Sequence, residues 1–393
     1  MKLPPLQGLP AKLAVSLEEL APEACHLSDF LASRPEPSGR EHVACSLHAD
    51  FLRRHGFDTR TGICGFETAF SAGKTWGTRD PVMTLLAEYD ALPGIGHGCG
   101  HNLAGAMTSL AAAAIVRSRE FENAELRVLG TPCEETGDAK VVMTDRGVFD
   151  DTDIALMIHP APGFTTVSFR SVAYSVREVS FREPPDRDDA NETGLLSEEA
   201  LDRFRLKLLS FHDESCPATV SPAYFDDGVE SFSAPGMAKG RFAFFSARRK
   251  FLDDFLEKVH EMADTESRRP GLLLSWETIG ADLSEFLPSK SAERHMLKIF
   301  RKLGLSEAGS PMLHGSADVG NVSRACPVVH PMLDVTGQRL PWHSRAFADA
   351  TTRPKAHEAL VLGAAALSLF VAEFALSKSF RQTVTEEHGS RRR

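Results

Sequence analysis

The stretch that decides the fold is VMTLLAEYDALPGIGHGCGHN, residues 82–102. It begins with a short apolar run, Val82 to Ala87, which is typical of a buried parallel strand. A proline and four glycines follow and predict a sharp loop. The Ala/Leu-rich sequence from Asn102 to Val116 then predicts a helix. We therefore expect a strand, a glycine-rich loop and a helix in immediate succession.

The same alternation of helices and apolar strands extends to both sides of this stretch. We expect helices at 17–31, 41–55, 139–146 and 355–376, strands at 126–129, 154–158, 328–329 and 333–335, and a glycine-containing loop around Gly62, Gly65 and Gly73. Apolar strands that alternate with helices predict an α/β domain with a mainly parallel sheet.

The pattern changes after Gly163. Residues 167–181 alternate like an antiparallel strand, 198–211 and 250–266 read as amphipathic helices, and 241–247 form an aromatic-rich strand. This order predicts a small inserted α+β domain. We expect the α/β domain in residues 1–172 and 292–393, and the inserted domain in residues 173–291.

Composition excludes several classes of protein. The chain has 393 residues, 42% hydrophobic and 25% charged, which is ordinary for a globular protein. A formal net charge of -10 argues against nucleic acid as a partner. The apolar stretch from Ala359 to Ala375 contains Glu373 and reads as a buried helix, so we expect no membrane partner. The start of the sequence has no apolar export signal and the seven cysteines lack disulfide spacing, which predicts reduced thiols and a cytoplasmic protein.

Polar groups follow three of the predicted strands. In open α/β sheets, catalytic groups lie in loops beyond the carboxyl ends of the strands. Such groups occur in four segments: Asp90, Cys99 and His101; Glu134 and Glu135; His159; and His343, which precedes the last predicted helix. We expect these segments to meet at one edge of the sheet.

Two of these segments suggest metal chemistry. Cys99 and His101 point to the same side of an extended loop, and a thiolate with imidazoles favours zinc or a neighbouring first-row ion. Glu134 and Glu135 point oppositely, so one could bind a metal while the other faces a bound water. Each feature also has a plain interpretation: a buried cysteine beside a surface histidine, or a solvated loop. His159 could likewise be a core histidine, so the hypothesis rests on all four segments together.

Six segments together resemble the M20 metallopeptidase family. They are Ala87–Pro93, Gly96–Asn102, Gly130–Glu135, Met157–Pro160, Gly315–Val322 and Trp342–Ser344, in the order and spacing of the family. The nearest likeness is to the aminoacylase/carboxypeptidase-like branch of amidohydrolases, which includes aminobenzoyl-glutamate hydrolase-type members.

The resemblance implies a zinc-peptidase-like catalytic domain with an inserted lid that also forms a homodimer. It implies two divalent metal ions, with zinc expected and manganese or cobalt as alternatives. The residues that match the metal ligands are Cys99, as a bridge, with His101, Glu135, His159 and His343. Glu134 matches the general base, and Asp90 matches a carboxylate that orients an imidazole. Ser316, Asp318 and Asn321 match a loop near the substrate.

The inserted domain departs from the family pattern. Where the family has a lid histidine that stabilises the oxyanion, alignment by count puts Arg187. Where the family has a substrate-binding lid asparagine, the count puts Phe232. An arginine remains a cation but cannot exchange protons at neutral pH. Arg241 or Arg248 could hold a substrate carboxylate.

Three functions follow from these residues. The first is hydrolysis of an amide bond in an N-acyl amino acid or dipeptide-like small molecule, with Glu134 as general base. The second is an M20-type enzyme whose altered lid has redirected it to amide formation or to a biosynthetic intermediate. The third is a non-catalytic metal-binding protein, which the presence of the base at Glu134 disfavours.

Overall fold

The computed structural model describes residues 9–118, 122–184, 195–222, 236–268, 271–308 and 315–391. The chain divides into two compact units. One comprises residues 1–170, 286–313 and 321–393, and the other comprises residues 171–285 and 314–320. The sequence-based boundaries are 172/173 and 291/292, and the main changes between the units fall at 170/171 and 285/286.

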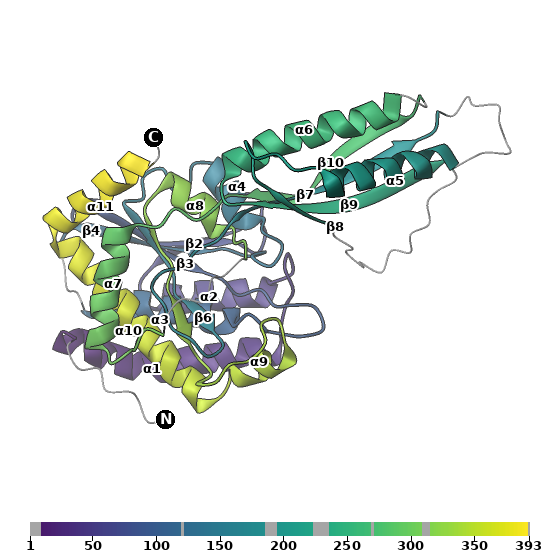
Figure 1. Cartoon of the computed structure of the whole chain (residues 1–393). Helices are drawn as coiled ribbons and strands as arrows, with labels where there is room; N and C mark the ends of the chain where they lie inside the picture. Colours follow the sequence, from purple (N-terminus) through teal and green to yellow (C-terminus); the bar gives the residue numbers. More distant parts are fainter. Residues whose placement is uncertain are drawn as a thin grey trace. The chain divides into compact units, whose positions relative to one another are not determined.

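The first unit is an α/β structure around a six-stranded sheet (Figure 1). The strand order is β1-β2-β4-β3-β5-β11, and β3, β4, β5 and β11 run parallel. The sheet strands are β1 (Asp58–Thr61), β2 (Phe70–Trp76), β3 (Val82–Ala87), β4 (Ala124–Gly130), β5 (Ile154–Leu156) and β11 (Val328–Val329). The parallel core confirms the fold class expected from the apolar strands.

This unit also contains helices, most of which share one large hydrophobic core with the sheet. They are α1 (Ala11–Ser33), α2 (His42–Arg54), α3 (His101–Ser118), α4 (Ala139–Asp145), α7 (Lys290–Lys302), α8 (Val319–Ala325), α9 (Arg345–Ala350), α10 (Pro354–Leu376) and α11 (Lys378–Arg391). Of the described helices, α10 has the length and composition of a membrane span. However, 83% of its apolar window is buried, and it packs on α3 and α1 as a core helix would.

Two local expectations were wrong. The region around Gly62, Gly65 and Gly73 is not only loop, because β1 and β2 form an antiparallel pair there and Gly73 lies inside β2. Pairing with β4 along the whole of β2 supplies the order that local sequence does not predict. The expected strand 154–158 ends at Leu156, and β6 (His159–Ala161) begins a separate pair with β12 (Met332–Asp334).

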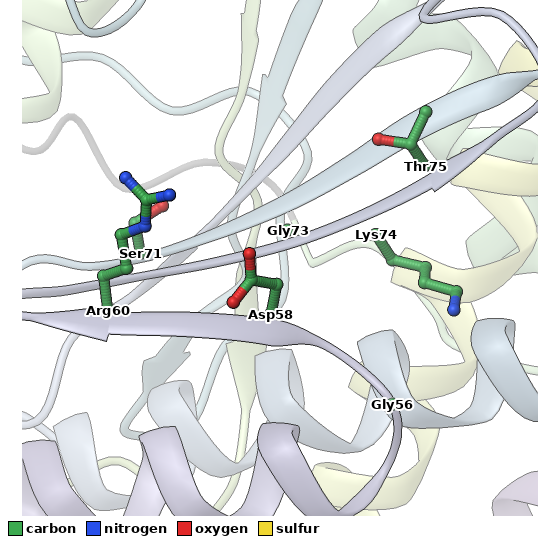
Figure 2. A pocket seen from close by; sticks show the side chains of 7 residues that line it. All are labelled: Gly56, Asp58, Arg60, Ser71, Gly73, Lys74 and Thr75. Atoms are coloured by element: carbon green, nitrogen blue, oxygen red, sulfur yellow. The ribbon is translucent and has the colours of Figure 1, made fainter.

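A shallow surface hollow lies over β1 and β2 (Figure 2). Its lining is Gly56, Asp58, Arg60, Ser71, Gly73, Lys74 and Thr75. None of the residues predicted to bind metal or substrate contributes to it.

The second unit is an antiparallel four-stranded sheet of order β10-β7-β9-β8. Its strands are β7 (Ala173–Arg182), β8 (Thr219–Pro222), β9 (Met237–Ser246) and β10 (Leu273–Leu283). Helices α5 (Leu195–Ser210) and α6 (Arg249–Arg268) contact each other and the sheet, and enclose a second core (Figure 1). Strand β10, which pairs with β7 along most of its length, was not expected from the sequence.

Buried histidines make the first unit sensitive to acid. His48 is completely buried, stacks near Phe70 and Tyr89, and its Nδ1 lies 2.8 Å from Ser109 Oγ. Burial lowers the pKa of His48 to about 3. The neutral imidazole is therefore favoured in the folded state, whereas the unfolded chain takes up a proton below a pH of about 6.5.

We expect the unfolding free energy of the metal-free protein to fall as the pH drops from about 6.5 toward 3. His48→Phe should flatten this dependence by about 1 kcal/mol per pH unit, because one proton uptake is removed. Urea unfolding at several pH values measures the pH dependence of the unfolding free energy. His26→Gln is the control, because His26 is exposed. Equal slopes in His48→Phe and the parent would contradict the assignment.

Candidate metal centre

The register of the parallel strands brings three of the predicted segments together. Ala87, the last residue of β3, pairs with Gly130, the last residue of β4. The chain therefore leaves both strands at the same edge of the sheet. Thr131, just beyond β4, still donates its N–H to the carbonyl of Ala87 at 2.8 Å. The loops that carry Asp90 and the Glu134-Glu135 pair thus start side by side.

Two glycines let the loop before α3 pack closely against its neighbours. Gly100 has φ +84°, and a Cβ there would meet Pro160 Cβ at 2.7 Å. A Cβ at Gly98 would lie 3.2 Å from the nitrogen of Ser344. The carbonyl of Gly98 accepts the N–H of His343 at 3.1 Å. The glycines flanking Cys99 therefore allow the His159 and His343 segments to approach it.

The predicted metal ligands converge in the first unit. In three groups, the potential ligand atoms all lie within 4.8 Å of one another. The groups are Cys99, His101 and His159; Cys99, Glu135 and His343; and His101, Glu134 and Glu135. Cys99 belongs to two of these groups, which fits a bridging position between two ions.

Asp90 lies behind these ligands and connects three segments. Its Oδ1 accepts a hydrogen bond from His101 Nδ1 at 2.9 Å, and its Oδ2 accepts from Ser38 Oγ at 2.8 Å and from the N–H of Glu135 at 3.0 Å. The carboxylate fixes the tautomer of His101 and leaves Nε2 facing the site. The hydrogen bond supports the predicted orienting role of Asp90, which stays a prediction.

The other ligands are oriented by the backbone. His159 Nδ1 donates to the carbonyl of Pro160 at 2.7 Å, which leaves Nε2 3.6 Å from Cys99 Sγ. His343 has φ +52° and a half-exposed side chain, and its Nε2 lies 3.5 Å from Glu135 Oε2. His343 is the most accessible of the predicted ligands.

Glu134, the predicted general base, follows a strained turn at Cys133 that sequence reasoning missed. Cys133 has φ +60°, and its N–H donates to Glu41 Oε1 at 2.9 Å. Glu41 is fully buried, and its Oε2 also accepts the Thr68 hydroxyl at 2.9 Å. Glu134 follows Cys133 directly, and its Oε2 lies 3.7 Å from His101 Nε2. No local signal links Glu41 to this turn, because the two are far apart in sequence.

Electrostatics also favour a bound cation. Burial raises the pKa of the Cys99 thiol and of Glu135. Although burial alone would raise the pKa of Asp90, the charge and hydrogen bond of His101 hold it well below its usual range. Two buried atoms, His101 Nε2 and Glu135 Oε1, make no hydrogen bond. Divalent metal ions would satisfy both atoms and stabilise the thiolate, so the donor set fits zinc or a similar ion.

The roles of the other predicted residues are not decided by these contacts. Arg187 and Phe232 lie outside the described residues. Arg241 lies in β9, where its Nε donates to Glu178 Oε2 at 2.7 Å. Ser316 and the buried Asp318 belong to the second unit, whereas Asn321 lies in the first. Their roles toward substrate remain predictions.

Comparison with known proteins agrees with this geometry. Residues 84–247 match the Peptidase family M20/M25/M40. The chain is 26% identical to the Xaa-Arg dipeptidase of Homo sapiens over 412 residues, covering 97% of this chain and 92% of that protein. It is 35% identical over 153 residues to one component of the p-aminobenzoyl-glutamate hydrolase of Escherichia coli (strain K12), covering 34% of this chain and 31% of that protein.

A solved structure has the same fold. It is a dinuclear metal-binding M20 peptidase from Bacillus subtilis, superposed with a TM-score of 0.67 at 16% identity, over 91% of this chain and 99% of that chain. Residues 84–247 therefore match an M20 peptidase domain, and the chain is similar over nearly its whole length to a relative named as a dipeptidase. The resemblance expected from the six segments is confirmed.

Replacing Asp90 tests how the ligands are held. Asp90→Asn keeps the size of the side chain but removes the charge that fixes His101, so we expect about 10–100-fold weaker zinc binding. Competition with a chromogenic chelator measures the affinity. Asp153→Asn is the matched control, since Asp153 accepts the N–H of Val82 at the opposite end of β3. Unchanged zinc affinity in Asp90→Asn would contradict the role of Asp90.

Proposed function

We propose that this protein is a two-metal amidohydrolase that cleaves the amide bond of a dipeptide or N-acyl amino acid. The observation that carries the proposal is the convergence of Cys99, two glutamates and three histidines in overlapping groups whose ligand atoms lie within 4.8 Å of one another. The sequence likeness to a dipeptidase over nearly the whole chain supports the same reaction class. Zinc is the expected metal, with manganese or cobalt as alternatives.

The proposed ligands divide between two positions that share Cys99. His101 and His159 would hold one ion, and Glu135 and His343 the other. When bound, such ions acidify a water molecule and polarise the amide carbonyl. Asp90 keeps His101 in the tautomer that presents Nε2. Burial around the ligands excludes competing water and strengthens each electrostatic contact.

Glu134 is the proposed proton carrier. Its carboxylate lies beside His101 Nε2 but is more accessible than His101 and Glu135, with 14% of the side chain exposed against 0% and 9%. It would take a proton from the attacking water and deliver it to the leaving nitrogen. The turn at Cys133, held by Glu41, keeps this carboxylate at the site.

The sequence of the inserted domain favours a second candidate. If Arg187 and Phe232 replace the histidine and asparagine of the family lid, the reaction could be amide formation or conversion of a biosynthetic intermediate. In that case Arg187 would stabilise the oxyanion as a fixed cation.

As a further proposal, the inserted domain forms a homodimer and the protein acts in the cytoplasm.

Glu134→Gln tests catalysis against simple metal binding. The amide cannot accept a proton, so we expect kcat to fall at least about 100-fold while the metal content stays at the parental value. Metal analysis and initial rates measure the two effects, with the exposed Glu67→Gln as control. Undetectable turnover in both the parent and Glu134→Gln would favour the non-catalytic alternative.

A substrate panel separates hydrolysis from redirected chemistry. The protein, loaded with zinc, manganese or cobalt, is incubated with Xaa-Arg and other dipeptides, N-acyl amino acids and p-aminobenzoyl-glutamate. We expect hydrolysis of at least one class, lost on chelation and restored by metal. Ordinary turnover would exclude the redirected enzyme, whereas no hydrolysis of any substrate in the panel by the metal-loaded protein would exclude the first proposal.

A further inference from the structure

A buried ion pair lies next to the proposed metal ligands. Glu88 follows β3, and Lys140 lies in the first turn of α4. Lys140 Nζ and Glu88 Oε1 are 2.7 Å apart, with 0% and 2% of the two side chains exposed. Among the described residues, Lys140 is the only lysine that is buried. Burying two charges is costly, so a pair in this position calls for an explanation.

The second oxygen of Glu88 faces the metal side of His101. Glu88 Oε2 lies 3.3 Å from His101 Nε2, and neither atom makes a hydrogen bond. Because Asp90 holds Nδ1, Nε2 is the nitrogen left for a metal ion. A Glu88 oxygen also lies within 4.8 Å of a carboxylate oxygen of Glu134. Glu88 therefore borders both the ligand and the proposed base.

The oxygen of Glu88 without a hydrogen bond distinguishes this arrangement from the most stable kind of structural ion pair. Such a pair is most stable when the remaining lone pairs of the carboxylate are also hydrogen-bonded. Here one oxygen is held by Lys140 and the other is directed, without a hydrogen bond, at the nitrogen that would bind the ion. The lysine also prevents Glu88 from presenting both oxygens to the site.

We propose that Glu88 is a further carboxylate of the metal centre, and that Lys140 is the positioning residue that aims Glu88 Oε2 at the metal side of His101. The inference rests on the proposed metal centre. It adds a residue pair outside the predicted ligand set of Cys99, His101, Glu135, His159 and His343. The Glu88 carboxylate would raise metal affinity by placing negative charge beside His101 Nε2, and Lys140 would fix its direction.

A double-variant comparison tests the pair. Glu88→Gln, Lys140→Met and the combined variant are compared for zinc affinity, by chelator competition, and for urea unfolding of the metal-free protein. We expect Glu88→Gln to bind zinc about 10–100-fold more weakly. Each single variant should unfold at lower urea, because it leaves one buried charge unpaired. The combined variant should recover the urea midpoint while its zinc affinity stays low.

The matched control is Glu125→Gln. Glu125 forms a largely buried pair with Arg127, 2.9 Å apart, in the same unit. Loss of the Glu125 charge in Glu125→Gln should lower the urea midpoint and leave zinc affinity at the parental value. The control therefore separates general loss of a buried ion pair from loss of a metal-facing carboxylate.

Zinc affinity decides the outcome. Parental affinity in Glu88→Gln or in the combined variant would overturn the proposal and leave the pair a structural one. If the combined variant does not fold, Glu88→Gln alone decides, with the visible spectrum of its cobalt(II) form as a second readout that should differ from the parent. Absence of zinc binding by the parent would instead overturn the metal centre itself, which distinguishes the two failures.

Discussion

The site depends on one buried carboxylate. Asp90 accepts hydrogen bonds from His101, from the backbone of Glu135 and from Ser38, so one side chain joins three segments that are distant in sequence. An ionised acceptor makes these bonds stronger than bonds between neutral groups. The Asp90 carboxylate therefore fixes the relative positions of His101, the loop that carries Glu135, and the segment around Ser38 that precedes α2.

Around this carboxylate, the fold concentrates charge where water is scarce. Burial raises the pKa of Cys99 and Glu135, while neighbouring histidine lowers that of Asp90. A divalent cation is the simplest group that satisfies such a set, because it compensates several carboxylates and a thiolate at once. The buried Lys140 supplies a fixed positive charge on the other side of Glu88. The centre is thus arranged by paired charges and not by the ligands alone.

Much of the site could be predicted because its parts follow strand ends. The apolar run Val82–Ala87 matches β3 residue for residue, and the loops after β3 and β4 carry Cys99, His101, Glu134 and Glu135. Other parts could not be predicted. Strand β2 exists through its pairing with β4, and Glu41 supports the Cys133 turn from a distant segment. Both depend on contacts that leave no periodic signal in the local sequence.

The sequence by itself determined the parallel α/β core and the resemblance to the M20 family, and it predicted the metal-binding residues, because hydrophobic periodicity and the order of six segments are local or linear properties. Only the tertiary structure decided that His159 starts a separate strand paired with β12, and that Glu88 and Lys140 form a buried pair beside His101. The physical reason is that burial and strand register depend on which distant residues come together, and a buried charge is explained only by its neighbours.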